Sequence, residues 1–398
     1  MHNLDTPAFI IKKDILDHSI QSLKSSLSKH FSNSILSYSL KTNSLPYILK
    51  AIKDKGGYAE VVSSDEYELA KLVGFDIKNI VYNGPLKSRL TFLEAIKNRA
   101  IVNIETKQEI DWLSELPKND IYHVGIRVNI DLDILAPEDA KENEGYSRFG
   151  FSPENNELEL ALQKISEHNN IRLTGLHAHR TTLSRAVKTY EEIANYIGQL
   201  AQKYSLELDY VDIGGGFYGI MEGKPTFDEY FTAIKNGLSL YFDVSRITVI
   251  IEPGNAVVAS AIDFVSQVVD VKKIKDFYAI TTDGSRNDLD PFYRKQSYFY
   301  SIYSKSSDSS KSPSVPLQII SGGTCLEYDK IFEIKDSGLL QVGDKIVYHS
   351  VGAYTMTLSP LFIRYFPNVY LLDENKSYSL IRNKWSAADF FNIYNTTK

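Results

Sequence analysis

The sequence predicts an α/β protein in which a (β/α)8 TIM barrel is followed by a second, mostly antiparallel β domain. Up to about residue 255, short runs rich in β-branched and aromatic residues alternate with longer segments of helical period. This alternation is typical of βα units around a parallel sheet. After Pro253, short runs of Tyr, Phe, Val and Ile separated by turn signals replace the helical period. At 398 residues, the chain is long enough for a barrel of about 250 residues and a smaller domain.

Eight short runs are the expected barrel strands. In chain order they lie at Ile35–Leu40, Tyr58–Val62, Asn79–Tyr82, Ile101–Ile104, Tyr122–Asn129, Ile171–Ala178, Leu208–Ile213 and Ile247–Ile251. Helical segments are expected between them, including Asp65–Val73 and Ser184–Tyr204. The last strand is almost entirely apolar, as expected for a strand buried on both faces. Eight such repeats favour a closed barrel, and a doubly wound open sheet is the alternative.

The β domain is expected to take the remaining chain. We place the barrel at residues 17–261 and assign residues 1–16 together with 262–398 to a β barrel or sandwich. Its turn signals include Asp283-Gly284 and Val342–Asp344. The segment Ser304–Ser314 is polar and of low complexity, so we expect a surface loop there.

Composition excludes several classes of protein. Lys and Arg number 44 against 50 Asp and Glu, so the net charge of −6 lacks the basic excess that nucleic-acid binding needs. The single cysteine, Cys325, excludes a disulfide framework and a multi-cysteine zinc site, and it indicates a reducing compartment. No signal-peptide pattern or long apolar run occurs, so we expect a cytoplasmic protein without a membrane partner.

Residues just past the carboxyl ends of barrel strands meet at one face, which makes them candidates for a site. Lys41 ends the first strand. A partly desolvated lysine there is a candidate to form a Schiff base with a carbonyl, whereas the alternative is a solvated surface lysine. The sixth strand ends in Leu176–His179, and strand alternation points one of its two imidazoles inward. A structural histidine is the alternative, and zinc is discounted because no third ligand lies nearby in the sequence.

The seventh strand runs into a glycine-rich loop. Gly214, Gly215 and Gly216 allow backbone N–H groups to approach an anion closely. The spacing also fits a dinucleotide motif, but Met221–Pro225 interrupts the helix that should follow at once. A single phosphate monoester is therefore the better fit.

The eighth strand ends in Glu252, a carboxylate that needs a cationic partner at the end of an apolar run. A protonated pyridine nitrogen would supply that partner. Together, the lysine, histidine, glycine loop and acid at the ends of four strands predict a pyridoxal 5'-phosphate (PLP) site.

These motifs resemble those of the fold-type III PLP-dependent amino-acid decarboxylases, which include the diaminopimelate and ornithine decarboxylases and share the barrel of alanine racemase. The resemblance covers nearly the whole chain. Its segments are Tyr38–Asn43, Gly57–Ser63, Leu176–His179, Asp212–Phe217, Glu252–Gly254, Gly322–Asp329 and Gly352–Tyr354.

The resemblance implies a set of cofactor contacts. PLP would be held by Lys41, with His179 stacked on its ring and Glu252 on its pyridine nitrogen. The other implied contacts are Arg127, Thr182, Gly214, Gly215, Gly216, Gly254 and Tyr354. Racemases of this fold place an arginine at the position of Glu252, so the acid favours decarboxylation.

The resemblance also implies the remaining chemistry. Cys325 would return a proton to Cα as the general acid. In the family this cysteine reaches the active site of the partner subunit, so a head-to-tail homodimer with shared active sites is implied.

Three departures from the family concern the substrate. Diaminopimelate decarboxylases have arginines where this chain has Asn255 and Asp290, and an acid where it has Leu326, followed here by Glu327. Loss of both arginines removes two contacts of about 1.5–3 kcal/mol each, so we expect poor use of meso-diaminopimelate. The loop after His179 also departs from the family, and Arg180 is a candidate to recognise a substrate carboxylate instead.

We therefore predict a PLP-dependent decarboxylase of a non-standard or conjugated amino acid, of the kind found in polyamine, siderophore or natural-product pathways. One alternative is an amino-acid racemase or epimerase, against which Glu252 and Cys325 argue. The other is a non-catalytic regulator that keeps the fold, as antizyme inhibitors do, but both Lys41 and Cys325 are present.

Overall fold

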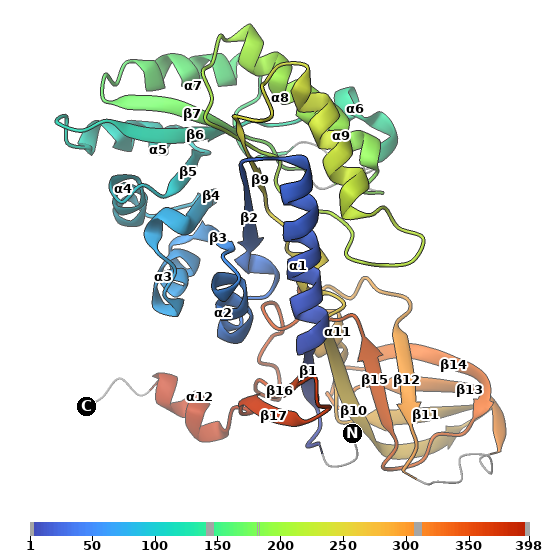
Figure 1. Ribbon diagram of the computed structural model, residues 1–398. Helices are drawn as coiled ribbons and strands as arrows, with labels where there is room; N and C mark the ends of the chain where they lie inside the picture. The colour runs from blue at the N-terminus through green and yellow to red at the C-terminus, as the bar shows by residue number, and fades with distance from the viewer. Residues whose placement is uncertain (1–3, 141–146, 181, 183, 306–312, 395–398) are drawn as a thin grey trace. The chain divides into compact units, whose positions relative to one another are not determined.

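The computed structural model describes residues 4–140, 147–180, 182, 184–305 and 313–394 (Figure 1). It consists of two compact units, one formed by His18–Val257 and the other by Met1–Asp17 with Val258–Lys398. The predicted limits of the barrel, 17–261, lie within a few residues of this division.

The first unit is a closed barrel of eight parallel strands, which confirms the predicted fold class. The strands are β2 (Ser34–Ser39), β3 (Tyr58–Ser63), β4 (Ile80–Leu86), β5 (Ile101–Ile104), β6 (Tyr122–Arg127), β7 (Ile171–His177), β8 (Tyr210–Asp212) and β9 (Thr248–Ile251). The barrel closes where β9 pairs with β2, and this pairing excludes the open-sheet alternative.

Helices lie outside the barrel strands (Figure 1). They are α1 (Lys13–His30), α2 (Pro46–Asp54), α3 (Ser64–Val73), α4 (Arg89–Lys97), α5 (Lys107–Trp112), α6 (Leu132–Leu135), α7 (Glu157–Ser166), α8 (Val187–Lys203), α9 (Phe227–Ser239) and α10 (Asn255–Val258).

The local sequence explains where some of these helices begin and end. Helix α3 begins where the Ser63 side chain accepts a hydrogen bond from the Glu66 N–H, and it ends at the left-handed Gly74. Helix α9 begins with a capping box formed by Thr226 and Glu229.

The interior of the barrel is built in layers. Towards the amino ends of the strands, an apolar layer is formed by Ile35, Tyr58, Val81, Ile101, Tyr210 and Ile250. Strand side chains alternate with a period of two, so the next inward position lies two residues further along each strand. The residues at those positions are Ser37, Glu60, Asn83, Asn103, Asp212 and Glu252. The second layer is therefore entirely polar, and it lies beneath the carboxyl ends of the strands.

The second unit is a nine-stranded sheet, which confirms the predicted β domain. Its strands are β1 (Ala8–Lys12), β10 (Ile262–Ile274), β11 (Phe277–Thr282), β12 (Phe299–Tyr303), β13 (Ser314–Ser321), β14 (Lys330–Gly338), β15 (Lys345–His349), β16 (Asn368–Leu372) and β17 (Tyr378–Arg382), with helices α11 (Arg286–Leu289) and α12 (Ala387–Tyr394). Most neighbours are antiparallel, and the parallel pairs are β1 with β16 and β11 with β13.

Most of the polar segment predicted as a loop, Ser304–Ser314, lies outside the described residues. Within the described part of the chain, we find no helix with the length and apolar character needed to cross a bilayer.

Candidate active site

The predicted lysine lies beside a buried carboxylate. Lys41 lies in a short 3-10 helix, η1 (Leu40–Thr42), that follows β2, and its Nζ lies 2.9 Å from Oε2 of Glu60 on β3. The Ser39 hydroxyl donates to the same oxygen at 2.5 Å. Glu60 is buried, whereas the Lys41 side chain is 38% exposed. The lysine is therefore anchored from below by an ion pair and keeps access to the mouth of the barrel.

Glu252 belongs to a buried polar cluster at the ends of β7, β8 and β9. Its Oε2 lies 3.5 Å from Nε2 of His177, and carboxylate oxygens of Glu252 and Asp212 lie within 4.8 Å of each other. Burial and the charge of Arg127 lower the pKa of His177 to about 3, so this imidazole is neutral at pH 7. Burial and the neighbouring Glu252 raise the pKa of Asp212 well above its ordinary value. Two carboxylates so close together in a buried site repel each other, and the raised pKa of Asp212 favours its protonated form.

The ground on which the sequence discounts zinc, the lack of a third ligand, does not hold in the folded chain. Ligand atoms of His177, Asp212 and Glu252 all lie within 4.8 Å of one another, so β8 and β9 supply the further ligands that the sequence near His177 lacks. Both carboxylates already accept protein hydrogen bonds. Asn83 donates to Glu252, and the Gly214 N–H donates to Oδ1 of Asp212 at 2.9 Å. These donors orient the two carboxyl groups without a metal ion.

The glycine-rich loop passes where no side chain fits. Gly214 and Gly216 have φ angles of 68° and 95°, in the left-handed region that favours glycine. A Cβ on Gly215 would lie 2.1 Å from the carbonyl oxygen of Glu252, and one on Gly214 would lie 2.6 Å from Cβ of His179. The loop therefore exposes backbone rather than side chains next to His179 and Glu252, as a phosphate cradle requires.

His179 lies half-buried beside this loop. Burial, with the nearby charges of Arg127 and Lys41, lowers its pKa to about 3, so the ring is neutral at pH 7. Its backbone carbonyl accepts a hydrogen bond of 3.1 Å from Nη2 of Arg127. Arg127 is itself held by the buried Glu105, with Nη1 at 2.9 and 3.0 Å from the two carboxylate oxygens. Arg127 thus supports the backbone that carries the histidine.

The other predicted site residues of the barrel lie within three positions of His179 or Glu252 in the sequence. Thr182 is buried, Arg180 is half-buried, and Asn255 begins α10. Gly254 packs against Thr42, because a Cβ on it would lie 1.9 Å from the Thr42 hydroxyl oxygen.

The predicted cysteine lies in the β unit. Cys325 is exposed in the turn between β13 and β14. The buried Asp329 organises this turn by accepting hydrogen bonds from the Thr324 hydroxyl at 2.5 Å, the Ser285 hydroxyl at 3.1 Å and the Arg286 N–H at 2.8 Å. We call residues 322–329 the cysteine turn. It is tied to the start of α11 by this single carboxylate.

The remaining predicted residues of the β unit differ in their freedom to bind a ligand. Glu327 and Tyr354 are exposed. Asp290 is buried, and its Oδ2 accepts hydrogen bonds from Nη2 of Arg286 at 3.0 Å and from the Lys295 N–H at 2.7 Å. Its carboxylate is therefore committed to contacts within the β unit.

Several residues of the site carried no predicted role. These are Glu60, Asn83, Asn103, Glu105 and His177. Their signal in the sequence is a polar residue at an inward position of an apolar strand, or just past its end. That signal indicates a buried polar group but does not name its partner.

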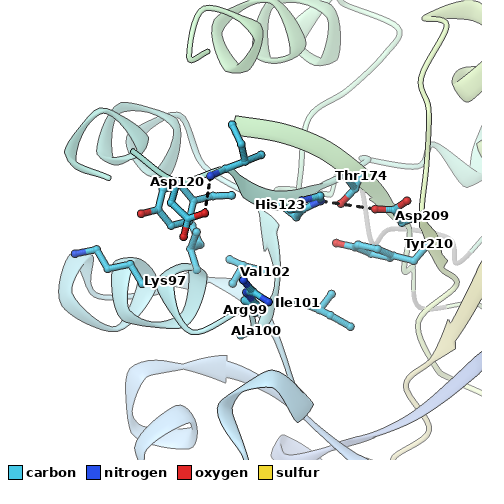
Figure 2. Close-up of a pocket in the computed structure, with 13 residues that line it drawn as sticks. Lys97, Arg99, Ala100, Ile101, Val102, Asp120, His123, Thr174, Asp209 and Tyr210 are labelled. Carbon is cyan, nitrogen blue, oxygen red and sulfur yellow. Dashed lines mark hydrogen bonds and ion pairs between the residues drawn. The ribbon is translucent and has the colours of Figure 1, made fainter. Parts of the chain in front are cut away.

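A separate pocket of about 460 Å³ opens at the amino ends of β5 to β8 (Figure 2). Its lining includes the charged side chains of Lys97, Arg99, Asp120 and Asp209, together with Val102 and Tyr210. It contains none of the predicted site residues. Barrel enzymes build their sites at the opposite, carboxyl face, so we assign the active site to Lys41 and its neighbours.

A parallel barrel with a lysine, a neutral histidine, a glycine-built cradle and a buried acid at one face defines a PLP-dependent enzyme. Residues 17–259 match the family described as pyridoxal-dependent decarboxylase, pyridoxal binding domain, and the chain belongs to this family. It is a PLP-dependent amino-acid decarboxylase, as the sequence predicts.

Individual relatives agree with this assignment. The diaminopimelate decarboxylase of Aquifex aeolicus is 25% identical over 389 residues, 95% of this chain and 89% of that protein. The L-glutamyl-[BtrI acyl-carrier protein] decarboxylase of Niallia circulans is 25% identical over 409 residues, 97% of this chain and 92% of that protein. A structure of Helicobacter pylori diaminopimelate decarboxylase with L-lysine shares the fold, with a TM-score of 0.81, 22% identity and coverage of 98% and 97% of the two chains.

The residues present fit PLP. The positions of the phosphate loop leave no room for a Cβ, and the buried Glu252 carboxylate contacts the His177 imidazole and the Asn83 amide. The Lys41 side chain is partly exposed, and an ion pair with Glu60 holds its amine in place.

Proposed function

We propose that this decarboxylase acts on a non-standard or conjugated amino acid rather than on meso-diaminopimelate. The observation that carries the proposal is the loss of the substrate-reading charges at three positions. Asn255 and Asp290 stand where diaminopimelate decarboxylases have arginines, and Leu326 stands where they have an acid. Because Arg286 and Lys295 occupy the Asp290 carboxylate, a substrate would have to compete with these contacts for it.

The relative from Niallia circulans supports a conjugated substrate. Its name states that it decarboxylates an L-glutamyl group carried by a protein, and it matches this chain over as much of its length as the diaminopimelate decarboxylases do. A conjugated substrate carries no free distal amino acid group, so it does not need the arginine clamp. Arg180, next to His179, is the cation that we assign to a substrate carboxylate.

We assign the catalytic roles as follows. PLP, when bound, supplies a ring that accepts the electron pair left at Cα when CO2 departs. Lys41 holds the cofactor covalently, and Glu60 positions the lysine amine. The ring of His179 would lie against the ring of the bound cofactor, and its neutral state would avoid a second cation beside the pyridinium.

Glu252 would provide the negative charge for the pyridine nitrogen, and the backbone of residues 214–216 would hold the phosphate. Thr182 and Tyr354 are further residues that we assign to the phosphate. Cys325 returns a proton to Cα from the partner subunit of a homodimer. The thiol loses that proton to carbon and regains one from solvent, so that the enzyme is unchanged after each turnover.

Carbon dioxide release tests the specificity directly. The panel contains meso-diaminopimelate, L-ornithine, an L-glutamyl thioester of an acyl-carrier protein and N-carboxyalkyl diamines, each with PLP-loaded enzyme. Loss of two charge-assisted contacts predicts a kcat/KM for meso-diaminopimelate at least about 100-fold below that of the best conjugate. Lys41→Ala is the blank, and Lys50→Ala, an exposed lysine paired only with Asp54 along α2, is the matched control. Meso-diaminopimelate as the best substrate would overturn the proposal.

A further inference from the structure

A chain of hydrogen bonds crosses the polar layer of the barrel and ends on Glu252. The Tyr210 hydroxyl donates to Oδ1 of Asn103 at 2.7 Å, and Nδ2 of Asn103 donates to Oδ1 of Asn83 at 2.8 Å. Nδ2 of Asn83 then donates to Oε1 of Glu252 and, at 3.3 Å, to Oε1 of Glu60. Strand β4 is not a neighbour of β9, nor β5 of β8, so these bonds run through the interior.

The two carboxylates fix the direction of the chain. If the Asn83 amide were reversed, its oxygen would face the carboxylate oxygens of Glu60 and Glu252. Asn83 must therefore present its NH2 group to them and its oxygen to Asn103. Asn103 in turn must present its NH2 group to Asn83, which leaves its oxygen to accept from Tyr210. Bonds aligned in this way polarise one another, so each donor strengthens the next.

The barrel makes room for the start of this chain. A Cβ on Gly125 would lie 2.1 Å from the Tyr210 hydroxyl oxygen, and one on Gly175 would lie 2.0 Å from Cζ of the same ring. Two strands thus carry glycine where the tyrosine ring crosses. Tyr210 also lines the pocket at the amino ends of the strands (Figure 2), but it is only 8% exposed. The hydroxyl is therefore shielded, and Asn103 is the hydrogen-bond acceptor that the structure gives it.

We propose that Tyr210, Asn103 and Asn83 are positioning residues that hold the Glu252 carboxylate against the cofactor's ring nitrogen. The inference rests on the role of Glu252 in the proposed function. Asn103 has a second task, because its Nδ2 also lies 3.4 Å from Oδ2 of Asp212, the protonated partner of Glu252. One amide thus steadies both members of the carboxyl pair.

The test uses substitutions that remove one hydroxyl. Tyr210→Phe keeps the ring between Gly125 and Gly175 and removes the first donor of the chain. Tyr82→Phe is the matched control, because it also removes a buried tyrosine hydroxyl, but one that bonds with Thr91 at 2.9 Å outside the chain. The readouts are the absorption spectrum of the bound cofactor across pH, the Kd for PLP, and the Tm.

These readouts require no substrate, so a wrong substrate assignment leaves them intact. The titratable groups beside the carboxyl pair are His177, His179, Glu60 and Tyr210 itself. Both variants leave the two histidines and Glu60 unchanged. We expect Tyr210→Phe to shift the pH midpoint of the cofactor spectrum by about 0.5–1 unit and to weaken PLP binding about three- to tenfold. We expect Tyr82→Phe to lower the Tm without moving either value.

Two results would overturn the inference. If Tyr210→Phe lowers the Tm as Tyr82→Phe does and leaves the spectrum and the Kd as in the wild type, the chain is merely structural. If Glu252→Gln itself leaves the spectrum unchanged, Glu252 does not face the ring nitrogen, and the positioning role fails with it.

Discussion

The charge states of the carboxyl groups in and beside the barrel interior are set by different surroundings. Glu60 is neutralised by Lys41, and Asp212 keeps a proton against Glu252. Glu66, at the start of α3, instead accepts a backbone hydrogen bond of 2.9 Å from the Val62 N–H, and burial raises its pKa to about 7. At neutral pH the protein therefore holds a partly ionised carboxylate in a place that disfavours its charge.

Glu66→Gln is expected to stabilise the protein at high pH. The pKa of Glu66 is raised on folding from 4.5 to about 7, so its stabilising protonated form is fully present below pH 4.5 and is lost as the pH rises through 7. Glutamine keeps an acceptor for the Val62 N–H and has no charge. We expect the Tm of the variant to exceed that of the wild type at pH 8 and the difference to vanish near pH 5.

The control for this prediction is Glu68→Gln on the same helix, where an exposed carboxylate lies 2.9 Å from Lys71. That pair is worth a few tenths of a kcal/mol, so its loss should slightly lower the Tm. A Glu66→Gln difference of the same size at both pH values would contradict the account.

At the scale of elements, the cysteine turn depends on one carboxylate. Asp329 accepts hydrogen bonds from both the turn and the start of α11, and a Cβ on Gly322 would lie 2.3 Å from its Oδ2. The turn therefore has little freedom to adopt another conformation while Asp329 is present. The position of Cys325 is set by a residue four places along the chain.

Asp329→Ala is expected to destabilise the β unit by about 2–4 kcal/mol, because it leaves the buried Ser285 hydroxyl and the part-buried donors of Thr324 and Arg286 without their acceptor. Urea denaturation measures the loss, and hydrogen exchange at the Thr324 and Arg286 amides locates it. Glu333→Gln, on the exposed face of β14, should change the stability by less than about 0.5 kcal/mol. Undiminished protection of both amides in Asp329→Ala would refute the role of this carboxylate.

The elements of the barrel could be predicted from the sequence, whereas the polar layer inside it could not. The alternation of β-rich runs with helical segments located every barrel strand, and only the ends of the strands were misplaced. For example, the strand expected at Tyr122–Asn129 is β6, Tyr122–Arg127. Asn83 and Glu252, in contrast, are 169 residues apart, and no local pattern selects one as the partner of the other. Glycines 214–216 could be predicted because their function is local, and Asn103 and Tyr210 could not because theirs depends on closure of the barrel.

At the scale of the whole molecule, the predicted site residues divide between the two units of the chain. Lys41, His179 and Glu252 lie in the barrel, and Cys325 and Tyr354 lie in the β unit. Our proposal that Cys325 serves the partner's barrel means that one intact active site needs two chains. A dimer with two-fold symmetry then carries two such sites.

Complementation tests this shared site. A heterodimer of Lys41→Ala and Cys325→Ala chains, co-expressed with different tags and purified through both, has one site with both residues intact. We expect it to regain about half of the wild-type activity, although each parent homodimer has little. A heterodimer as inactive as the parents would show that Lys41 and Cys325 of the same chain act together.

The protein is a decarboxylase, and we propose that Asn255, Asp290 and Leu326 direct it away from meso-diaminopimelate. The ratio of kcat/KM for CO2 release from the best conjugated substrate to that from meso-diaminopimelate tests it most directly, with Lys41→Ala subtracted. The account predicts a ratio of about 100 or more. A ratio of one or below, with meso-diaminopimelate turned over at an ordinary enzymatic rate, would contradict it.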